Sequence, residues 1–175
     1  MTKKLLNIIN FIMFQTIWFV TAWGMTNNLE YIGIISIIIS ALVHIKISKQ
    51  KVNTIVFYLS ALIIGIVTDA IFLKTNCISI PDHHNIILKK LCLAGLWINF
   101  ATTFEYSLNW IQKRYLLAMS LAFFGGPLAY YSGSKIGAIE IYDPAILSYI
   151  KIGVLWCVAM ALLMFIFNKA KAIKI

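Results

Sequence analysis

The sequence "LCLAGLWINFATTFEYSLNWI" (Leu91–Ile111) is apolar enough to cross a bilayer, yet its second half is rich in polar side chains. We predict one helix, on which the apolar Trp97, Phe100 and Phe104 face lipid. The polar half is expected to face protein or a wet cavity, because burying polar groups in lipid is costly. The polar residues of this half are Asn99, Thr102, Thr103, Glu105, Tyr106 and Asn109, and Gln112 directly after the span belongs to the same face.

Composition places the whole chain in the same class. The 175 residues are 61% hydrophobic and 12% charged, whereas a soluble domain is about 45–50% apolar and about 25% charged. The apolar residues form runs close to the length of about 20 residues that a spanning helix needs. We therefore predict an all-α membrane protein, a single domain (1–175) built as a bundle of six transmembrane helices. The expected spans are about 5–23, 31–47, 52–73, 91–111, 115–137 and 148–168.

The net charge of +9 is explained by membrane topology. The lysines flank apolar runs, and no nucleic-acid recognition motif accompanies them. Anionic membrane lipids are therefore the expected partners, and nucleic acid is not. Ten Lys and Arg side chains fall on the side of the two termini and five on the other, which predicts that both termini are cytoplasmic.

No metal or cofactor site is expected. The three cysteines lack the C-x-x-C spacing of a zinc site, and their odd number argues against a disulfide framework. The outer loop "TNCISIPDHHN" (75–85) offers Cys77, Asp82, His83 and His84, but no second cluster completes a coordination sphere. We expect this loop to be solvated.

Several polar side chains are predicted to share one depth near the cytoplasmic ends of their helices. His44 and Glu105 each lie one to two turns from such an end, and Asn7, Asn10 and Asn109 reach similar depths. One interpretation is a proton-coupled or substrate-binding site. The other is that each side chain pairs with a neighbouring helix and fixes its packing.

Asp69 lies toward the opposite side of the membrane. It aligns with Tyr58, Ala61 and Gly65 on one face of its span. Lys135 and Lys151 are the cations expected to neutralise it, and the same two interpretations apply. The complete set of membrane-embedded polar candidates is Glu105, Asp69, His44, Asn99, Thr102, Asn109, Asn7 and Asn10.

The fifth span contains Gly125, Gly126 and Pro127 near its middle. Proline removes a backbone donor and clashes with the carbonyl four residues earlier. We predict a helix that is kinked or broken there. Broken helices near the midplane form substrate or ion sites in transporters, whereas a simple kink serves packing.

Two motifs carry a resemblance that extends over essentially the whole chain. "LWINFATTFEYSLNWI" (96–111) is followed by "GGPLAYYSGSKIGAI" (125–139), and "FQTIWF" (14–19) and Asp69 fit the same pattern. The chain resembles the small bacterial inner-membrane proteins of domain-of-unknown-function family 2878. The resemblance implies an inner-membrane location and points to lipid-modifying enzymes as partners, and it implies no established activity.

Three functions remain open. The favoured one is a small permease-like carrier, with the fifth helix and the polar face of the fourth lining a path. The first alternative is a membrane-embedded enzyme, or an accessory subunit, in fatty-acid or phospholipid modification. Catalysis needs groups that converge at one depth, and the sequence offers only His44 with Glu105 and no catalytic motif. The second alternative is a non-catalytic scaffold that recruits soluble proteins to its basic face.

Overall fold

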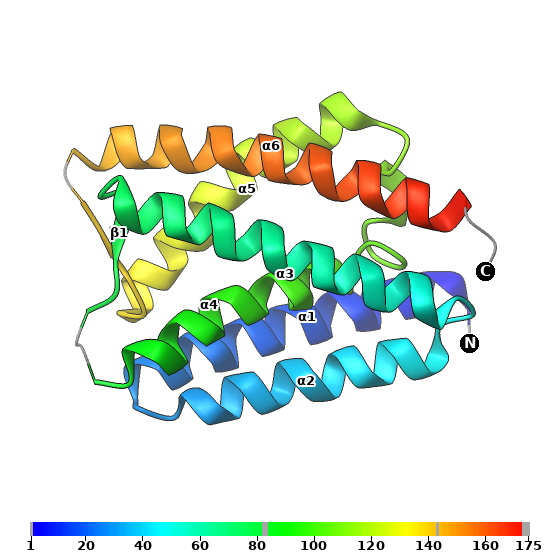
Figure 1. Cartoon of the computed structure of the whole chain (residues 1–175), viewed down its shortest axis with the longest axis horizontal. Coiled ribbons are helices and arrows are strands. Elements are labelled where there is room, and N and C mark those ends of the chain that lie inside the picture. Colours follow the sequence, from blue (N-terminus) through cyan, green and yellow to red (C-terminus); the bar gives the residue numbers. More distant parts are fainter. Residues whose placement is uncertain (1, 82–83, 143, 173–175) are drawn as a thin grey trace.

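The computed structural model describes residues 2–81, 84–142 and 144–172. Within them the chain folds into a single bundle of α-helices, closed at one end by a short antiparallel sheet (Figure 1). The all-helical class is thereby confirmed. The helices are α1 (Lys3–Thr26), α2 (Glu30–Ile47), α3 (Lys51–Lys74), α4 (Ile86–Ala101), α5 (Tyr115–Ile136) and α6 (Ala145–Ala172).

The two ends of the bundle differ. At the sheet end, β1 (Ile78–Ser79) pairs with β2 (Glu140–Ile141) and joins the α3–α4 connection to the α5–α6 connection. Part of the loop expected to be solvated is therefore a strand, while Asp82 and His83 lie outside the described residues. The start of α1 and the finish of α6 lie together at the opposite end, called here the terminal end (Figure 1).

Four helices, α1, α2, α3 and α6, are long and apolar enough to cross a membrane by length and composition. Large apolar side chains such as Ile63 and Phe165 stand on the outer surface, with 62% and 58% of their area exposed. Contiguous apolar surface of this kind suits lipid rather than water. That α4 and α5 also span the membrane stays a prediction.

The face predicted for the third span is confirmed. Tyr58, Ala61, Gly65 and Asp69 are all buried in α3. A Cβ on Gly65 would lie 2.2 Å from Cγ of Trp97, so this glycine lets the indole ring of α4 pack directly on the α3 backbone. Close approach of helices at small residues is the ordinary way in which membrane spans pack.

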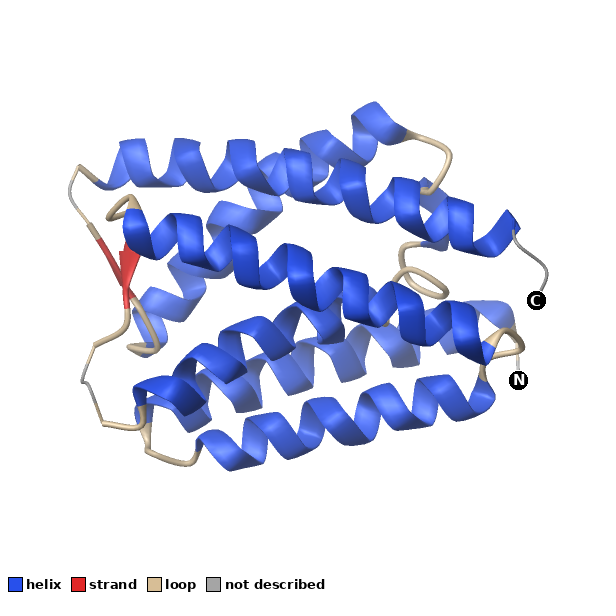
Figure 2. Cartoon of the chain, in the orientation of Figure 1, coloured by secondary structure: helices blue, strands red, loops and turns tan. Residues whose placement is uncertain are grey.

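The prediction of one helix from Leu91 to Ile111 is wrong. Helix α4 ends at Ala101, and turns followed by the 3-10 turn η1 (Asn109–Ile111) lead into α5. The hydroxyl groups of Thr102 and Thr103 donate to the carbonyls of Asn99 and Phe100 at 2.7 and 2.6 Å. Such side-chain bonds compete with the helical backbone pattern. Residues 102–114 are called the interior segment, and Figure 2 shows most of it as loop.

The orientation expected for the apolar half of this stretch is also wrong. Trp97, Phe104 and Ile111 are buried inside the bundle and do not face lipid. The helical wheel does not apply beyond Ala101, because the backbone no longer advances by about 100° per residue there. The chain instead folds back so that both polar and apolar side chains contact protein.

Helix α5 is continuous through Pro127, so the chain is not broken at the Gly-Gly-Pro sequence. A kink there stays a prediction. The two glycines have different surroundings: a Cβ on Gly126 would lie 2.3 Å from Cγ of Trp156, whereas a Cβ on Gly125 would meet nothing within 4 Å. Gly126 therefore admits the indole ring of α6, and Gly125 faces open space.

We predict opposite effects for one added methyl group at these neighbouring positions. Gly126→Ala forces Trp156 to move, and overpacking of this kind costs about 1–3 kcal/mol. Gly125→Ala should be neutral or stabilising by up to about 1 kcal/mol, because alanine favours helix more than glycine does. Thermal unfolding of the detergent-solubilised variants measures both, and equal stabilities would contradict the packing described.

Candidate functional site

Asn10 of α1 lies at the centre of a buried hydrogen-bond cluster. Its side-chain Nδ2 donates to the carbonyl of Thr102 at 3.2 Å and lies 3.1 Å from Nε2 of His44. Its Oδ1 accepts from the hydroxyl of Ser107 at 2.7 Å and from the backbone N–H of the same residue at 3.4 Å. Both donors and both acceptor positions of the carboxamide are thus used.

The surroundings of His44 fix its tautomer. Its Nδ1 lies 2.8 Å from the carbonyl of Ser40, which can only accept. Nδ1 therefore carries the hydrogen, and Nε2 accepts from Asn10. The imidazole is buried and also contacts the ring of Tyr106, with 5.7 Å between the ring centroids. Through these contacts His44 links the interior segment to α1 and α2.

The structure brings together only part of the predicted cluster. His44, Asn10 and Thr102 meet, and buried Asn99 is close by, donating from Nδ2 to the carbonyl of Phe14 at 3.0 Å. Asn7 and Asn109 are partly exposed, and within the described residues neither side chain is hydrogen-bonded to the cluster.

Glu105 lines a cavity whose lining residues do not include His44. The expected pairing of His44 with Glu105 is therefore not formed: no hydrogen bond or ion pair joins them in the part of the chain that the structure describes. No group of three His, Cys, Asp or Glu side chains suited to a metal ion occurs among the described residues either.

Asp69 is buried between two aromatic donors. Its carboxylate accepts from the hydroxyl of Tyr130 at 2.5 Å and from Nε1 of Trp97 at 3.1 Å. The expected neutralisation by Lys135 and Lys151 is wrong, since Lys151 is exposed and Lys135 lies over the ring of Tyr131. The carboxylate links α3, α4 and α5 at the centre of the bundle.

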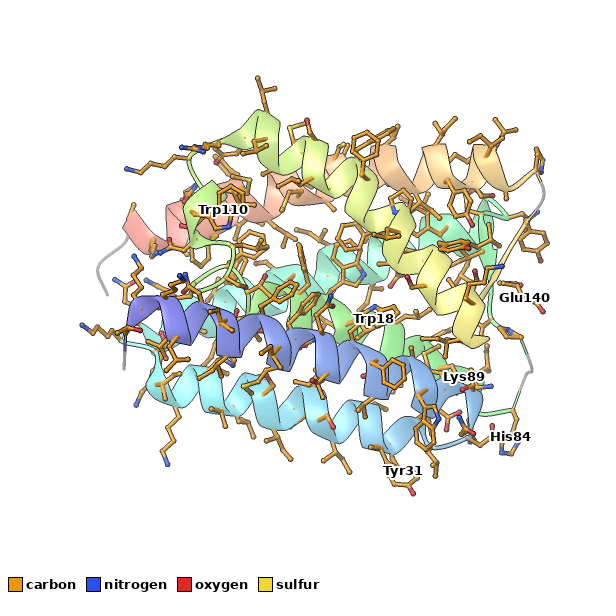
Figure 3. The ribbon with its side chains drawn as sticks, turned by 180° about the vertical axis from the view of Figure 1, so that it is seen from behind. Trp18, Tyr31, His84, Lys89, Trp110 and Glu140 are labelled. Atoms are coloured by element: carbon orange, nitrogen blue, oxygen red, sulfur yellow. The ribbon has the colours of Figure 1, made fainter. Side chains whose placement is uncertain are left out.

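A large apolar hollow, called here the lateral groove, lies between α1 and α5. It has a volume of about 560 Å³, and in Figure 3 Trp18 lies between these two helices. Toward the sheet end it continues into a narrower space of about 80 Å³ lined by Trp97 and Tyr130, the two donors to Asp69. The groove is lined by Phe14, Gln15, Trp18, Phe19, Phe100, Leu108, Ile111, Leu121, Ala122, Gly125, Gly126, Leu128, Ala129, Ser132, Trp156 and Met160.

A second hollow, called here the polar cavity, lies at the terminal end and has a volume of about 260 Å³. The α2–α3 turn, the first turns of α3, the last turns of α6 and the interior segment enclose it. The side chain of Asn53 links α3 to α6, because it donates to the carbonyl of Ala170 at 2.8 Å. The cavity is lined by Ser48, Lys49, Gln50, Asn53, Thr54, Phe57, Tyr58, Ala101, Glu105, Phe167, Ala170 and Lys171.

Phe104 of the interior segment separates the two hollows. Its ring is 1% exposed and lies with its centroid 5.6 Å from that of Phe100, which lines the lateral groove. On the other side it contacts Phe57 and Phe167, at 5.1 and 5.6 Å, and both of these line the polar cavity. These four rings are called the aromatic partition.

Sequence reasoning missed Trp97, Tyr130, Trp156 and Phe104 as site residues. Trp97 and Tyr130 lie 28 and 61 positions from Asp69, so no local spacing connects them to it. For Trp156 the available signal was Gly126 on the neighbouring helix. Small residues in membrane helices mark positions where another helix packs closely, and Trp156 packs against this glycine.

Apolar helices around a hydrogen-bonded polar interior indicate a helical membrane protein. The chain belongs to the family described as protein of unknown function (DUF2878), whose model matches residues 7–162. The family expected from the two motifs is thereby confirmed. Comparisons with curated proteins and with solved structures give no match.

Removing the Asn10 carboxamide should destabilise the protein strongly. Asn10→Ala leaves buried groups on His44, Thr102 and Ser107 without their partner, at a cost of about 1–3 kcal/mol for each group left unsatisfied. Asn7→Ala, one turn earlier on the same helix, should change stability by less than about 0.5 kcal/mol. Denaturant or thermal unfolding in detergent compares the two, and a similar effect of both substitutions would contradict the central position of Asn10.

Proposed function

We propose that this chain is a small permease-like carrier that moves amphipathic, lipid-like molecules across the membrane. The observation that carries the proposal is the interior segment, which forms a wall of both hollows. Leu108 and Ile111 line the lateral groove, while Glu105 of the same segment lines the polar cavity. An apolar compartment and a polar one are therefore separated by a short stretch of irregular chain.

Irregular backbone within the bundle supports this proposal. In lipid, non-helical backbone is tolerated only where it is buried in protein or lines a cavity. Interrupted helices of this kind provide the binding sites of many transporters. The interior segment has turn-type backbone hydrogen bonds, such as those from the N–H groups of Thr103 and Ile111 to the carbonyls of Phe100 and Leu108, in place of the regular pattern of an α-helix.

The dimensions of the lateral groove suit a hydrocarbon chain. Small-molecule pockets have volumes of about 300–1,000 Å³ and are mostly apolar, and this groove has about 560 Å³. Its walls are aromatic and aliphatic apart from Gln15 and Ser132. Because it lies between two helices that carry exposed apolar side chains, the surrounding bilayer is the nearest source of an occupant.

The proposed carrier has six spans, with α4 and α5 included, and both termini on the cytoplasmic side of a bacterial inner membrane. The excess of Lys and Arg on the side of the termini supports this orientation. The terminal end, with the polar cavity, then faces the cytoplasm. We also propose that α5 bends at Pro127. Such a bend would widen the lateral groove beside Gly125.

The carrier explains the hollows better than the two alternatives do. For an enzyme built on His44 and Glu105 the support is weaker, because no hydrogen bond or ion pair joins these two side chains among the described residues. A scaffold needs neither a groove nor a cavity. Lipid-modifying enzymes as partners remain a prediction from the family resemblance.

Filling the lateral groove should slow the carrier without unfolding it. Gly125→Trp adds a large side chain where a Cβ meets nothing within 4 Å. In proteoliposomes, movement of a phospholipid with a fluorescent label on one acyl chain should be slowed roughly tenfold, equivalent to about 1.4 kcal/mol. The matched control is Ser120→Trp, at an exposed position of the same helix outside the groove, which should retain the rate of the unmodified protein.

Two results would contradict the proposal. One is a rate of lipid movement with the unmodified protein that does not exceed the rate in protein-free liposomes. The other is an equal reduction of the rate of lipid movement by Gly125→Trp and Ser120→Trp. That result would mean that a large side chain anywhere on the lipid-facing surface slows movement, whether or not it fills the groove.

A further inference from the structure

We infer that the polar cavity binds a phospholipid headgroup that carries both a phosphate and a primary ammonium group. This inference deepens the proposed function and rests on it, because it identifies the class of lipid that the carrier takes. The charged groups of the cavity and the hydroxyl of Tyr58 carry the inference.

Two polar groups that line the cavity have no hydrogen-bond partner among the described residues. The carboxylate of Glu105 is half-buried and makes no ion pair or hydrogen bond within the described residues. Tyr58 is buried, with 7% of its surface exposed, and its hydroxyl has no hydrogen-bond partner in the described part of the chain. A carboxylate and a phenol that both line one cavity form a site for a donor that carries positive charge.

Positive charge lies in the same cavity. Lys49, from the α2–α3 turn, and Lys171, from the last turn of α6, both line it. The ammonium group of Lys171 lies 4.9 Å from the ring centroid of Phe167 and is thereby held at the cavity wall. Two exposed lysines and one carboxylate that line the same cavity favour a ligand that has an anionic part as well as a cationic part.

The headgroup chemistry follows from these groups. Phosphate suits the lysines, and a primary ammonium, which has N–H donors, suits Glu105 and the hydroxyl of Tyr58. A choline headgroup has the positive charge but no N–H to donate, and a glycerol headgroup has no cation. A volume of about 260 Å³ accommodates phosphoethanolamine, since one water molecule occupies about 30 Å³ in the liquid.

The position of the cavity fits this ligand. It lies at the terminal end, beside the interior segment whose opposite side borders the lateral groove. A headgroup in the cavity and an acyl chain in the groove would be separated only by the aromatic partition. The same lipid can therefore use both hollows in successive positions of one transport cycle.

The test compares three phospholipids with identical acyl chains and ethanolamine, choline or glycerol headgroups. Native mass spectrometry of the purified full-length protein measures the amount of each lipid bound in competition. We expect the ethanolamine lipid to be preferred roughly tenfold, equivalent to about 1.4 kcal/mol, because only its headgroup donates charged hydrogen bonds to Glu105 and Tyr58. Glu105→Gln and Tyr58→Phe should each reduce this preference.

The controls separate this inference from the proposed function. Glu140→Gln removes an exposed carboxylate at the sheet end and should leave the preference intact. Gly125→Trp should reduce the binding of all three lipids equally, because it acts on the groove. Thermal unfolding of each variant verifies that it is folded, and Tyr58→Phe keeps the buried aromatic ring.

The outcomes are distinguishable. Lipid binding without headgroup preference, or a preference that Glu105→Gln leaves unchanged, would overturn the inference and leave the carrier proposal intact. Absence of bound lipid in the unmodified protein would contradict the carrier proposal itself. Displacement of the ethanolamine lipid by soluble phosphoethanolamine supports the assigned headgroup chemistry, whereas binding of the soluble compound alone would show that the ligand is not a lipid.

Discussion

The four hydrogen bonds of the Asn10 side chain determine the arrangement of everything around the interior segment. Without a partner from α1, the carbonyl of Thr102 and the polar groups of Ser107 would be buried unsatisfied, and a helical continuation of α4 would be favoured. With Asn10 in place the chain leaves the helix and folds back. Two further side chains complete this anchoring. The amide of Gln112 donates to the carbonyl of Phe104, and the amide of Asn168 donates to the carbonyl of Gln112 at 3.2 Å.

The fold-back creates the two hollows and keeps them apart. It places Phe104 between them, with Glu105 on the polar side and Leu108 on the apolar side. The groove wall is in turn supported from the core, because Asp69 holds Trp97 and Tyr130, and the ring of Trp97 stacks on Trp156 with 4.7 Å between centroids. A carboxylate in the bundle interior thus positions Trp97 and Tyr130, which line the narrower space, and through Trp97 it supports Trp156, which lines the groove.

Much of the fold follows from local sequence, whereas the site depends on distant contacts. Apolar runs near bilayer length identify the helices, and the small and polar positions of α3, such as Gly65 and Asp69, identify its buried face. The end of α4 at Ala101 could not be predicted, because Asn10, the residue that makes it favourable, precedes Thr102 by 92 positions. A helical wheel assumes that the helix continues, and so it assigned Phe104 to lipid. The depth estimated along the same assumed helix placed Glu105 level with His44.

The backbone conformation of residues 102–108 in a lipid bilayer tests this account most directly. Nuclear magnetic resonance of the isotope-labelled protein in lipid nanodiscs gives both the Cα chemical shifts and the distances to the side-chain amide of Asn10. We expect the run of helical shifts to be interrupted between Thr102 and Leu108, and the side-chain amide of Asn10 to contact Ser107. Helical shifts that continue unbroken from Ile86 to Ile111, with no such contact, would contradict it.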